Sequence, residues 1–254
     1  MRKICILFIV MVIAFIVFTC WQNNQIAISE YNIITKKIHD DITIVQISDL
    51  HNKNWNGDLY NLTKKYKPDY IVLTGDIVDY YQTDIQCSMN QIIPLTELAP
   101  VYFVSGNHEK NSVWYDTFIK QLSDNGIIVL ENKTVLLEEI EIIGVKDNNK
   151  NIPTPTAEKY SILLAHRPEY FDTYTESCVD LVLSGHTHAG QICLPFYGGV
   201  YAPGQGFFPK YLTGKHEKDG TTMIISRGLG NSSIPFRIFN QPELVVINIS
   251  CETK

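Results

Sequence analysis

The sequence predicts an α/β domain that follows a single N-terminal apolar helix. Short apolar runs rich in β-branched residues recur along the chain, and stretches with helical character lie between several of them. The first segment, in contrast, is apolar almost without interruption. The 254 residues suffice for one large domain with a substantial core, and 45% hydrophobic with 19% charged residues is typical of a globular protein.

The apolar first segment runs from Ile4 to Trp21, about 18 residues, which is near the lower limit for crossing a bilayer. Arg2 and Lys3 precede it, whereas no charge follows it before Glu30. The positive-inside rule therefore places the N-terminus in the cytoplasm. We expect a single-pass protein of the cell membrane whose folded domain lies outside the cytoplasm.

The fate of this segment leaves three alternatives, of which we favour an uncleaved signal anchor over residues 1–21. A cleaved signal peptide is the second, but no small-x-small cleavage site stands out. Lipidation at Cys20 is the third, but Phe18 and Thr19 match a bacterial lipoprotein box poorly.

Five apolar runs with the character of strands buried on both faces mark the body of the domain. They lie at 42–48, 70–74, 101–105, 161–165 and 181–184. Helices are expected at 58–66, 85–98, 112–122 and 168–178, and later strands at 135–137, 139–145, 222–226 and 244–249. Residues 22–40 lack either pattern, so we interpret them as a linker and 41–254 as the domain.

Each of the five runs ends at a short polar block. In chain order the blocks are Asp49-Leu50-His51, Gly75-Asp76-Ile77-Val78-Asp79, Gly106-Asn107-His108-Glu109, His166-Arg167-Pro168 and Gly185-His186-Thr187-His188. Ligands of open α/β sheets bind outside the carboxyl ends of the strands. Five strands that each deliver a metal-ligand residue type to one edge are difficult to explain by core packing.

The residue types in these blocks suit metal ions. The carboxylate of Asp76 has two oxygens and can bridge two cations, and Asn107 offers a neutral amide oxygen. Histidines at i and i+2, as at His186 and His188, are a moderately specific metal signal. Any single block is weak, and Asp49 with His51 alone is more often a surface loop. The order of all five is much more specific.

Three neighbours of these candidates have other expected roles. His108 can face a substrate in place of a metal. Asp79 is expected to cap a helix or to support a ligand, and Glu109 to lie at the start of the next helix, where an acid is favoured. Arg227 and Arg237 could contact an anion, but a structural ion pair is at least as consistent with the sequence for each.

With these blocks the sequence resembles the calcineurin-like metallophosphoesterase superfamily, from about Ile42 to Ile249. The segments Gly185–Gln191, Ser226–Gly230 and Pro235–Arg237 are similar to a bacterial membrane-anchored subgroup related to UDP-2,3-diacylglucosamine hydrolases. Ala165 and Ala189 stand where glycine is frequent in these relatives, and both are small. The resemblance implies a four-layer α/β/β/α sandwich.

The resemblance also implies the ligand sets of a dinuclear centre. Asp49, His51 and His188 would hold the first metal. Asn107, His166 and His186 would hold the second, and Asp76 would bridge the two. His108 would protonate the leaving oxygen or hold a phosphate oxygen, with Asn107 beside it.

The implied activity is phosphoester hydrolysis, as a phosphodiesterase or phosphatase. Two cations about 3.5–4 Å apart lower the pKa of a bridging water, and the resulting hydroxide attacks phosphorus in line. Mixed imidazole and carboxylate ligands suit Mn, Fe or Zn. The anchor makes the membrane a partner and makes a lipid-linked phosphoester a reasonable substrate, with a nucleotide as the alternative.

Two other functions compete with this one. A nuclease of the same superfamily is disfavoured, because the net charge is −6 and no basic or aromatic-interleaved stretch is present. We therefore expect no nucleic-acid partner. A non-catalytic, membrane-tethered binding protein would be signalled by the loss of a metal ligand, and none of the seven candidate ligands is lost.

Overall fold

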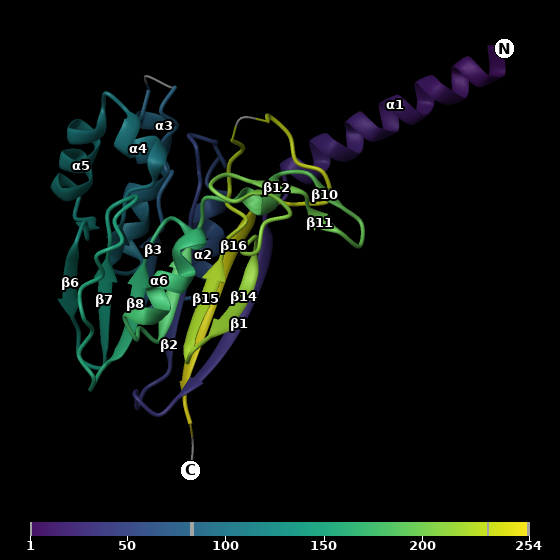
Figure 1. The fold of residues 1–254 in the computed structure, drawn as a ribbon. Coiled ribbons are helices and arrows are strands. Elements are labelled where there is room, and N and C mark those ends of the chain that lie inside the picture. Colours follow the sequence, from purple (N-terminus) through teal and green to yellow (C-terminus); the bar gives the residue numbers. More distant parts are fainter. Residues whose placement is uncertain (1, 82–83, 233, 253–254) are drawn as a thin grey trace.

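The computed structural model describes residues 2–81, 84–232 and 234–252. Two six-stranded sheets pack face to face, helices cover their outer sides, and α1 (Arg2–Asn23) projects from one end of the body (Figure 1). The α/β prediction and the four-layer arrangement are both confirmed.

The first sheet has the order β1-β16-β2-β3-β4-β5. Its strands are β1 (Ala27–Thr35), β16 (Glu243–Cys251), β2 (Ile42–Ile47), β3 (Tyr70–Leu73), β4 (Val101–Phe103) and β5 (Ile128–Val129). Strands β2 to β5 are parallel, so their carboxyl ends meet at one edge. Strand β16 runs antiparallel to β2 and parallel to β1.

The second sheet has the order β14-β15-β9-β8-β7-β6. Its strands are β14 (Gly214–Lys218), β15 (Thr221–Ile225), β9 (Leu181–Ser184), β8 (Tyr160–Leu164), β7 (Ile140–Gly144) and β6 (Lys133–Leu136). The four central strands are parallel, and β14 and β6 close the sheet as antiparallel edges.

Helical segments follow most of the expected positions. They are α2 (Asp58–Lys65), α3 (Gln86–Ile92), η1 (Ile93–Glu97), α4 (Asn107–Asn111), α5 (Tyr115–Asp124), η2 (Pro168–Tyr170), α6 (Phe171–Glu176) and η3 (His188–Gly190). Two short hairpins that we did not predict follow η3. They are formed by β10 (Cys193–Leu194) with β11 (Gly198–Gly199) and by β12 (Tyr201–Ala202) with β13 (Gly206–Phe207).

Three buried apolar clusters separate the four layers. One cluster packs Leu59 of α2 and Phe118 of α5 onto the outer face of the first sheet. The second lies between the two sheets and includes Ile44 and Ile162. The third packs Phe171 of α6 onto the outer face of the second sheet. Both faces of the central strands are therefore buried, which explains their unbroken apolar runs.

The interpretation of residues 22–40 as a linker is wrong for Ala27–Thr35, because these residues form β1, which pairs over its whole length with β16. The strand was difficult to recognise for two reasons. It is an edge strand in which polar residues such as Glu30 and Asn32 alternate with apolar ones. Its partner also lies more than 200 residues away, so no local hairpin signal accompanies it.

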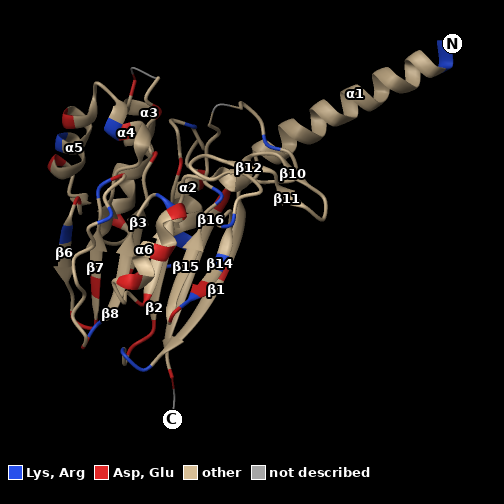
Figure 2. Ribbon diagram, viewed as in Figure 1, with Lys and Arg blue, Asp and Glu red and all other residues tan. Residues whose placement is uncertain are grey.

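Helix α1 is long and apolar enough to cross a membrane, and no part of its apolar stretch is buried in the protein. Figure 2 shows that the helix has charged residues only near its N-terminus. Its C-terminal end is attached to the domain: the backbone N–H of Phe239 donates to Gln22 Oε1 (2.9 Å), and the N–H of Arg237 donates to Asn23 Oδ1 (2.9 Å).

Candidate metal centre

The polar blocks of both sheets meet at one rim of the sandwich. Each candidate ligand lies two to four residues beyond the carboxyl end of β2, β3, β4, β8 or β9. A buried side chain of β2 joins the two sheets at this level, because Gln46 Nε2 donates to Thr74 Oγ1 (3.0 Å) and to the carbonyl of Ser184 (2.9 Å). Parallel strands from two sheets thus bring together residues that are far apart in sequence.

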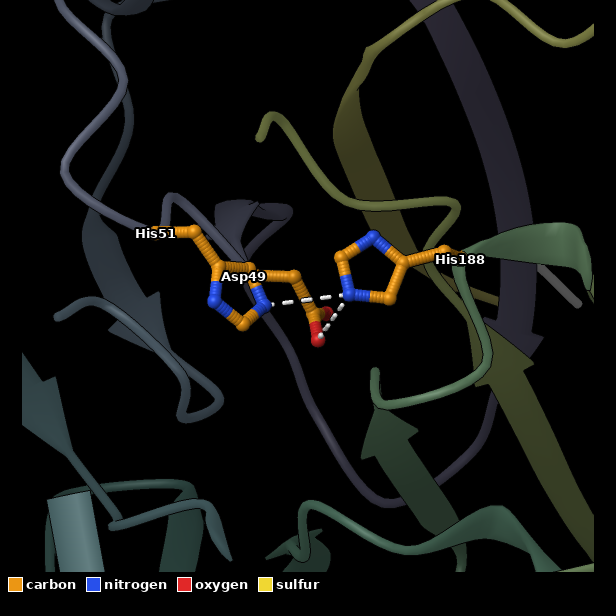
Figure 3. A group of neighbouring side chains, drawn as sticks. All are labelled: Asp49, His51 and His188. Carbon is orange, nitrogen blue, oxygen red and sulfur yellow. Dashed lines mark hydrogen bonds and ion pairs between the residues drawn. The ribbon is translucent and has the colours of Figure 1, made fainter. Parts of the chain in front are cut away.

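The first group of side chains is formed by Asp49, His51 and His188 (Figure 3). Nε2 of His51 lies 3.1 Å from Nε2 of His188, and this second nitrogen lies 3.4 Å from Asp49 Oδ1. Two imidazole nitrogens and a carboxylate oxygen therefore face the same small volume. All three residues are buried.

The second group is formed by Asp76, His166 and His186, with Asn107 beside them. Nε2 of His166 lies 3.1 Å from Asp76 Oδ2, 3.1 Å from His186 Nδ1 and 3.3 Å from Asn107 Oδ1. One ring nitrogen is therefore surrounded by a carboxylate, a second imidazole and an amide oxygen.

Asp76 lies between the two groups. Its Oδ2 is 3.1 Å from His166 Nε2 on one side and 3.8 Å from His51 Nε2 on the other. Its second oxygen, Oδ1, accepts a hydrogen bond from the backbone N–H of His108 (2.8 Å). The carboxylate is thus fixed in the position that a bridging ligand would need.

Burial strongly affects the protonation of these groups. Burial lowers the pKa of His51 to about 4 and the pKa values of His186 and His188 well below the usual range, so their rings are neutral and offer lone pairs. Burial also raises the pKa of Asp49 to about 6. Burial acts to raise the pKa of Asp76 as well, but the facing His166 outweighs it and holds this pKa well below its ordinary value.

The backbone is strained at most of the candidate ligands. Asp49, His51, Asp76, His186 and His188 all have a positive φ, between 46° and 72°. Residues other than glycine rarely adopt this left-handed conformation, and it persists only where the surrounding structure imposes it. Five of the seven candidates share it, and such strain is characteristic of functional sites.

Two glycines allow the loops to approach one another. A Cβ at Gly106 would lie 2.2 Å from Asp76 Oδ1, and a Cβ at Gly185 would lie 2.3 Å from Asp49 Oδ2. Any side chain at either position would displace a candidate ligand. The glycines in the Gly-Asn-His-Glu and Gly-His-Thr-His blocks are thus explained by close packing against carboxylates.

His108 lies at the open side of the centre, where its side chain is partly exposed. Its Nε2 is 4.0 Å from Asp76 Oδ2, and its Nδ1 is 3.3 Å from Asp79 Oδ1. The other oxygen of Asp79 lies 3.9 Å from His51 Nδ1. Asp79 is therefore placed to orient His108, which agrees with the supporting role expected for it.

Glu109 has a role that the sequence analysis only partly described. It lies in the first turn of α4, as expected, but it is fully buried and reaches back to the loop of Asp76. Its two oxygens accept hydrogen bonds from four backbone N–H groups, those of Asp76 (2.9 Å), Ile77 (2.5 Å), Val78 (3.0 Å) and Gly106 (2.8 Å). The carboxylate thereby fixes the backbone that carries Asp76.

We expect Glu109→Gln to lower kcat/KM for a phosphoester by about 10- to 100-fold, the usual effect of losing a residue that orients a metal ligand. Each carboxylate oxygen of Glu109 accepts hydrogen bonds from two backbone N–H groups. In glutamine, an NH₂ group would replace one of these oxygens, so its two N–H donors would face two backbone N–H donors. Steady-state kinetics and metal affinity measure the effect. Glu176→Gln, an exposed change at the end of α6, is the control, and unchanged kinetics in both variants would contradict this role.

The side chains of Arg227 and Arg237 both bind other groups of the protein. Arg227 forms an ion pair with the buried Glu243 (3.0 Å), which agrees with the structural alternative. Arg237 is fully buried and donates to the backbone carbonyls of Gly228 (3.1 Å), Gly230 (3.1 Å) and Arg227 (2.8 Å). It has no carboxylate partner among the described residues, so the expected ion pair is replaced by backbone contacts.

The donor set fits transition-metal ions. Four imidazoles, two carboxylates and one amide oxygen are the ligand types that Mn, Fe and Zn accept. Nδ1 of His51 is buried without a hydrogen-bond partner. Nε2 of His51 and Nε2 of His188 face each other at 3.1 Å in rings that are both neutral, so both nitrogens can offer a lone pair to one cation. Ligation itself remains a prediction.

Glu109 and Arg237 were not assigned to the site from sequence. A signal did exist for Glu109, because it stands three residues after Gly106, the spacing of a side chain that reaches back to the residue before a helix. Arg237 gave no such signal, because its partners are carbonyl groups of a loop whose path the sequence does not reveal.

Comparison with known proteins places the chain among phosphoesterases. The family pattern described as "Calcineurin-like phosphoesterase" matches residues 42–190. Metallophosphoesterase YkuE of Bacillus subtilis is 32% identical over 83% of this chain and 79% of its own length. YkoQ, another metallophosphoesterase of that organism, is 30% identical over 80% and 82%. Phosphodiesterase YaeI of Escherichia coli is 28% identical over 81% of each chain.

Proposed function

Since this chain belongs to the calcineurin-like phosphoesterase family and is a phosphoester hydrolase, we propose that it acts as a dinuclear phosphodiesterase at a membrane surface. The observation that carries the proposal is the position of Asp76 between two groups of buried nitrogen and oxygen donors. A single carboxylate shared by two ligand sets is the arrangement that a pair of neighbouring ions requires.

Seven side chains would hold the ions. Asp49, His51 and His188 would bind one, Asn107, His166 and His186 the other, and Asp76 both. Two such ions, when bound, supply positive charge for phosphate oxygens and lower the pKa of water. Mn, Fe and Zn all suit these ligands.

The residues of the chain would contribute orientation and proton transfer. His108 lies nearest the open side and is partly exposed, so its ring can donate a proton to a leaving oxygen or hold a phosphate oxygen. Asp79, 3.3 Å from its Nδ1, would keep the ring in position. The amide nitrogen of Asn107 would be free to donate to the substrate while its oxygen binds metal.

A diester with a membrane-linked or nucleotide group is the substrate class that we favour. The E. coli relative named as a phosphodiesterase supports the reaction type. Helix α1, if it crosses the membrane, would hold the centre near lipid headgroups on the extracytoplasmic side. The net charge of −6 argues against a nucleic acid.

Metal removal tests the proposal directly. We expect the full-length chain purified in detergent to contain close to two equivalents of metal and to hydrolyse bis-p-nitrophenyl phosphate when Mn is added. Treatment with a chelator should abolish the activity, and Mn should restore it. Elemental analysis and the release of p-nitrophenol measure both quantities. A fully active chain that retains no metal would contradict the proposal.

A histidine pair provides the matched variants. His188→Ala should lose at least one metal equivalent and nearly all activity, because His188 Nε2 faces both Asp49 and His51. His216→Ala should retain both, because His216 lies on β14 and its ring contacts the carbonyl of Thr213 and the ring of Tyr211. Equal metal content and activity in the two variants would refute this ligand assignment.

A further inference from the structure

An apolar surface lies on the two short hairpins that follow the candidate metal centre. We call the side chains of Leu194, Phe196, Tyr197, Phe207, Phe208 and Phe239 the aromatic surface. The exposed fractions are 104% for Phe196, 83% for Phe208 and 73% for Phe207. Large apolar side chains gathered at the surface commonly mark protein or membrane contacts.

The aromatic surface is continuous with the C-terminal end of α1. The rings of Phe18 in α1 and Phe239 lie 5.5 Å apart, and the backbone of Phe239 is hydrogen-bonded to Gln22. Phe239 in turn lines a hollow of about 560 Å³ together with Leu194 and Phe196. Figure 1 shows β10, β11 and β12 at the end of the body from which α1 projects. A bilayer crossed by α1 would therefore begin next to these side chains.

The chemistry of the hairpins suits the interface of a bilayer. Residues 181–209 contain no Lys, Arg, Asp or Glu, and Figure 2 shows the hairpin strands without charged residues. No charge would therefore have to leave water if the hairpins entered the headgroup region. The β-strand pairing of each hairpin satisfies part of its backbone. Tyrosines and other aromatic rings are favoured at this depth.

We propose that the aromatic surface is a second membrane contact, which lies in the headgroup region of the phospholipid bilayer that α1 crosses. The proposal depends on α1 entering the bilayer and is independent of the reaction that the domain catalyses. A second copy of the chain is the competing occupant. The bilayer is favoured because the ring of Phe239 already packs on the helix that would enter it.

The contact would determine which way the candidate metal centre faces. Strand β10 begins three residues after the last residue of η3, which contains His188. Tyr201 and Pro203 from the second hairpin line a hollow of about 120 Å³ together with His188 and Thr187. Hairpins held in the headgroup region would therefore keep one side of the centre next to the bilayer.

Photo-crosslinking in vesicles tests the contact. The photoreactive residue p-benzoylphenylalanine would be placed in the full-length chain at Phe196 or Phe208, at Phe8 within α1, or at Val113. Val113 is 91% exposed and lies between α4 and α5, two helices that Figure 1 shows at a distance from α1. Each protein would be reconstituted into vesicles of phosphatidylethanolamine and phosphatidylglycerol and irradiated. Mass spectrometry would then identify phospholipid adducts.

We expect positions 196 and 208 to give at least about tenfold more lipid adduct than position 113, as aromatic interface residues should. Lipid adducts at position 8 but no excess at 196 and 208 would overturn the docking proposal alone. Adducts of 196 or 208 with a second copy of the chain in place of lipid would also overturn it. A lack of adducts at position 8 would overturn the membrane span and the docking together. Since the replaced side chains are exposed, none of these substitutions is expected to unfold the domain.

Discussion

Asp76→Asn is expected to lower kcat/KM for a phosphoester by about 10³-fold or more, the largest effect on activity of any single change considered, because removal of one fixed electrostatic contact already costs about 10²–10³-fold. The substitution keeps the size of the side chain and one of its oxygens. It removes the negative charge between the two ligand groups, and an amide could bind one cation through oxygen but could not bridge two equally well.

Metal analysis and kinetics together test this expectation. Asp76→Asn should contain less metal than the parent chain, and added Mn should not restore its activity fully. Asp116→Asn is the matched control, because Asp116 is an exposed residue of α5 that lies outside the candidate metal centre. If Asp76→Asn retained two equivalents of metal and the activity of the control, Asp76 would not be a bridging ligand.

Arg237→Met is expected to lower the free energy of unfolding by about 3 kcal/mol or more, because each buried polar group left unpaired costs about 1–3 kcal/mol. The guanidinium donates to the carbonyls of Gly228, Gly230 and Arg227, which belong to the loop that follows β15. Methionine fills a similar volume but donates to none of them. In the parent chain, Nη2 of Arg237 also lies 3.2 Å from His188 Nδ1, so the ring of this candidate ligand should move in the variant as well.

Urea unfolding of the full-length chain in detergent measures this change. Lys133→Met, an exposed change on the edge strand β6, should alter stability by less than about 0.5 kcal/mol and serves as the control. An Arg237→Met variant with unchanged stability and a raised KM would show that this arginine contacts the substrate, the alternative that the sequence left open.

The candidate metal ligands could be predicted from the sequence because each of them follows closely after the end of a buried strand, and such an end is visible in the local sequence. A short apolar run that stops at Asp49 or His166 identifies the end of a buried strand, and parallel strands deliver their ends to a common edge. The strands β2, β3, β8 and β9 were placed to within one or two residues for the same reason.

The contacts that stabilise the site could not be predicted in this way. Glu109 acts on the backbone of a loop about 30 residues earlier, and backbone groups give no signal in a sequence. The hairpins after His188 have strands of only two residues, too short for an alternating pattern, and their exposed aromatic residues look like core residues when only their types are known. Strand β1 was missed because its partner β16 lies more than 200 residues later in the chain.

The position of β16 limits how early the first sheet can fold during synthesis. This strand is the last of the two sheets in chain order, yet it lies between β1 and β2, and β1 follows directly after α1. The first sheet therefore cannot close until β16 has been synthesised, and until then the edge of β2 in the nascent chain remains unpaired. A stop codon before residue 243 would leave this gap permanently open, and quality-control proteases at the membrane should recognise the truncated chain.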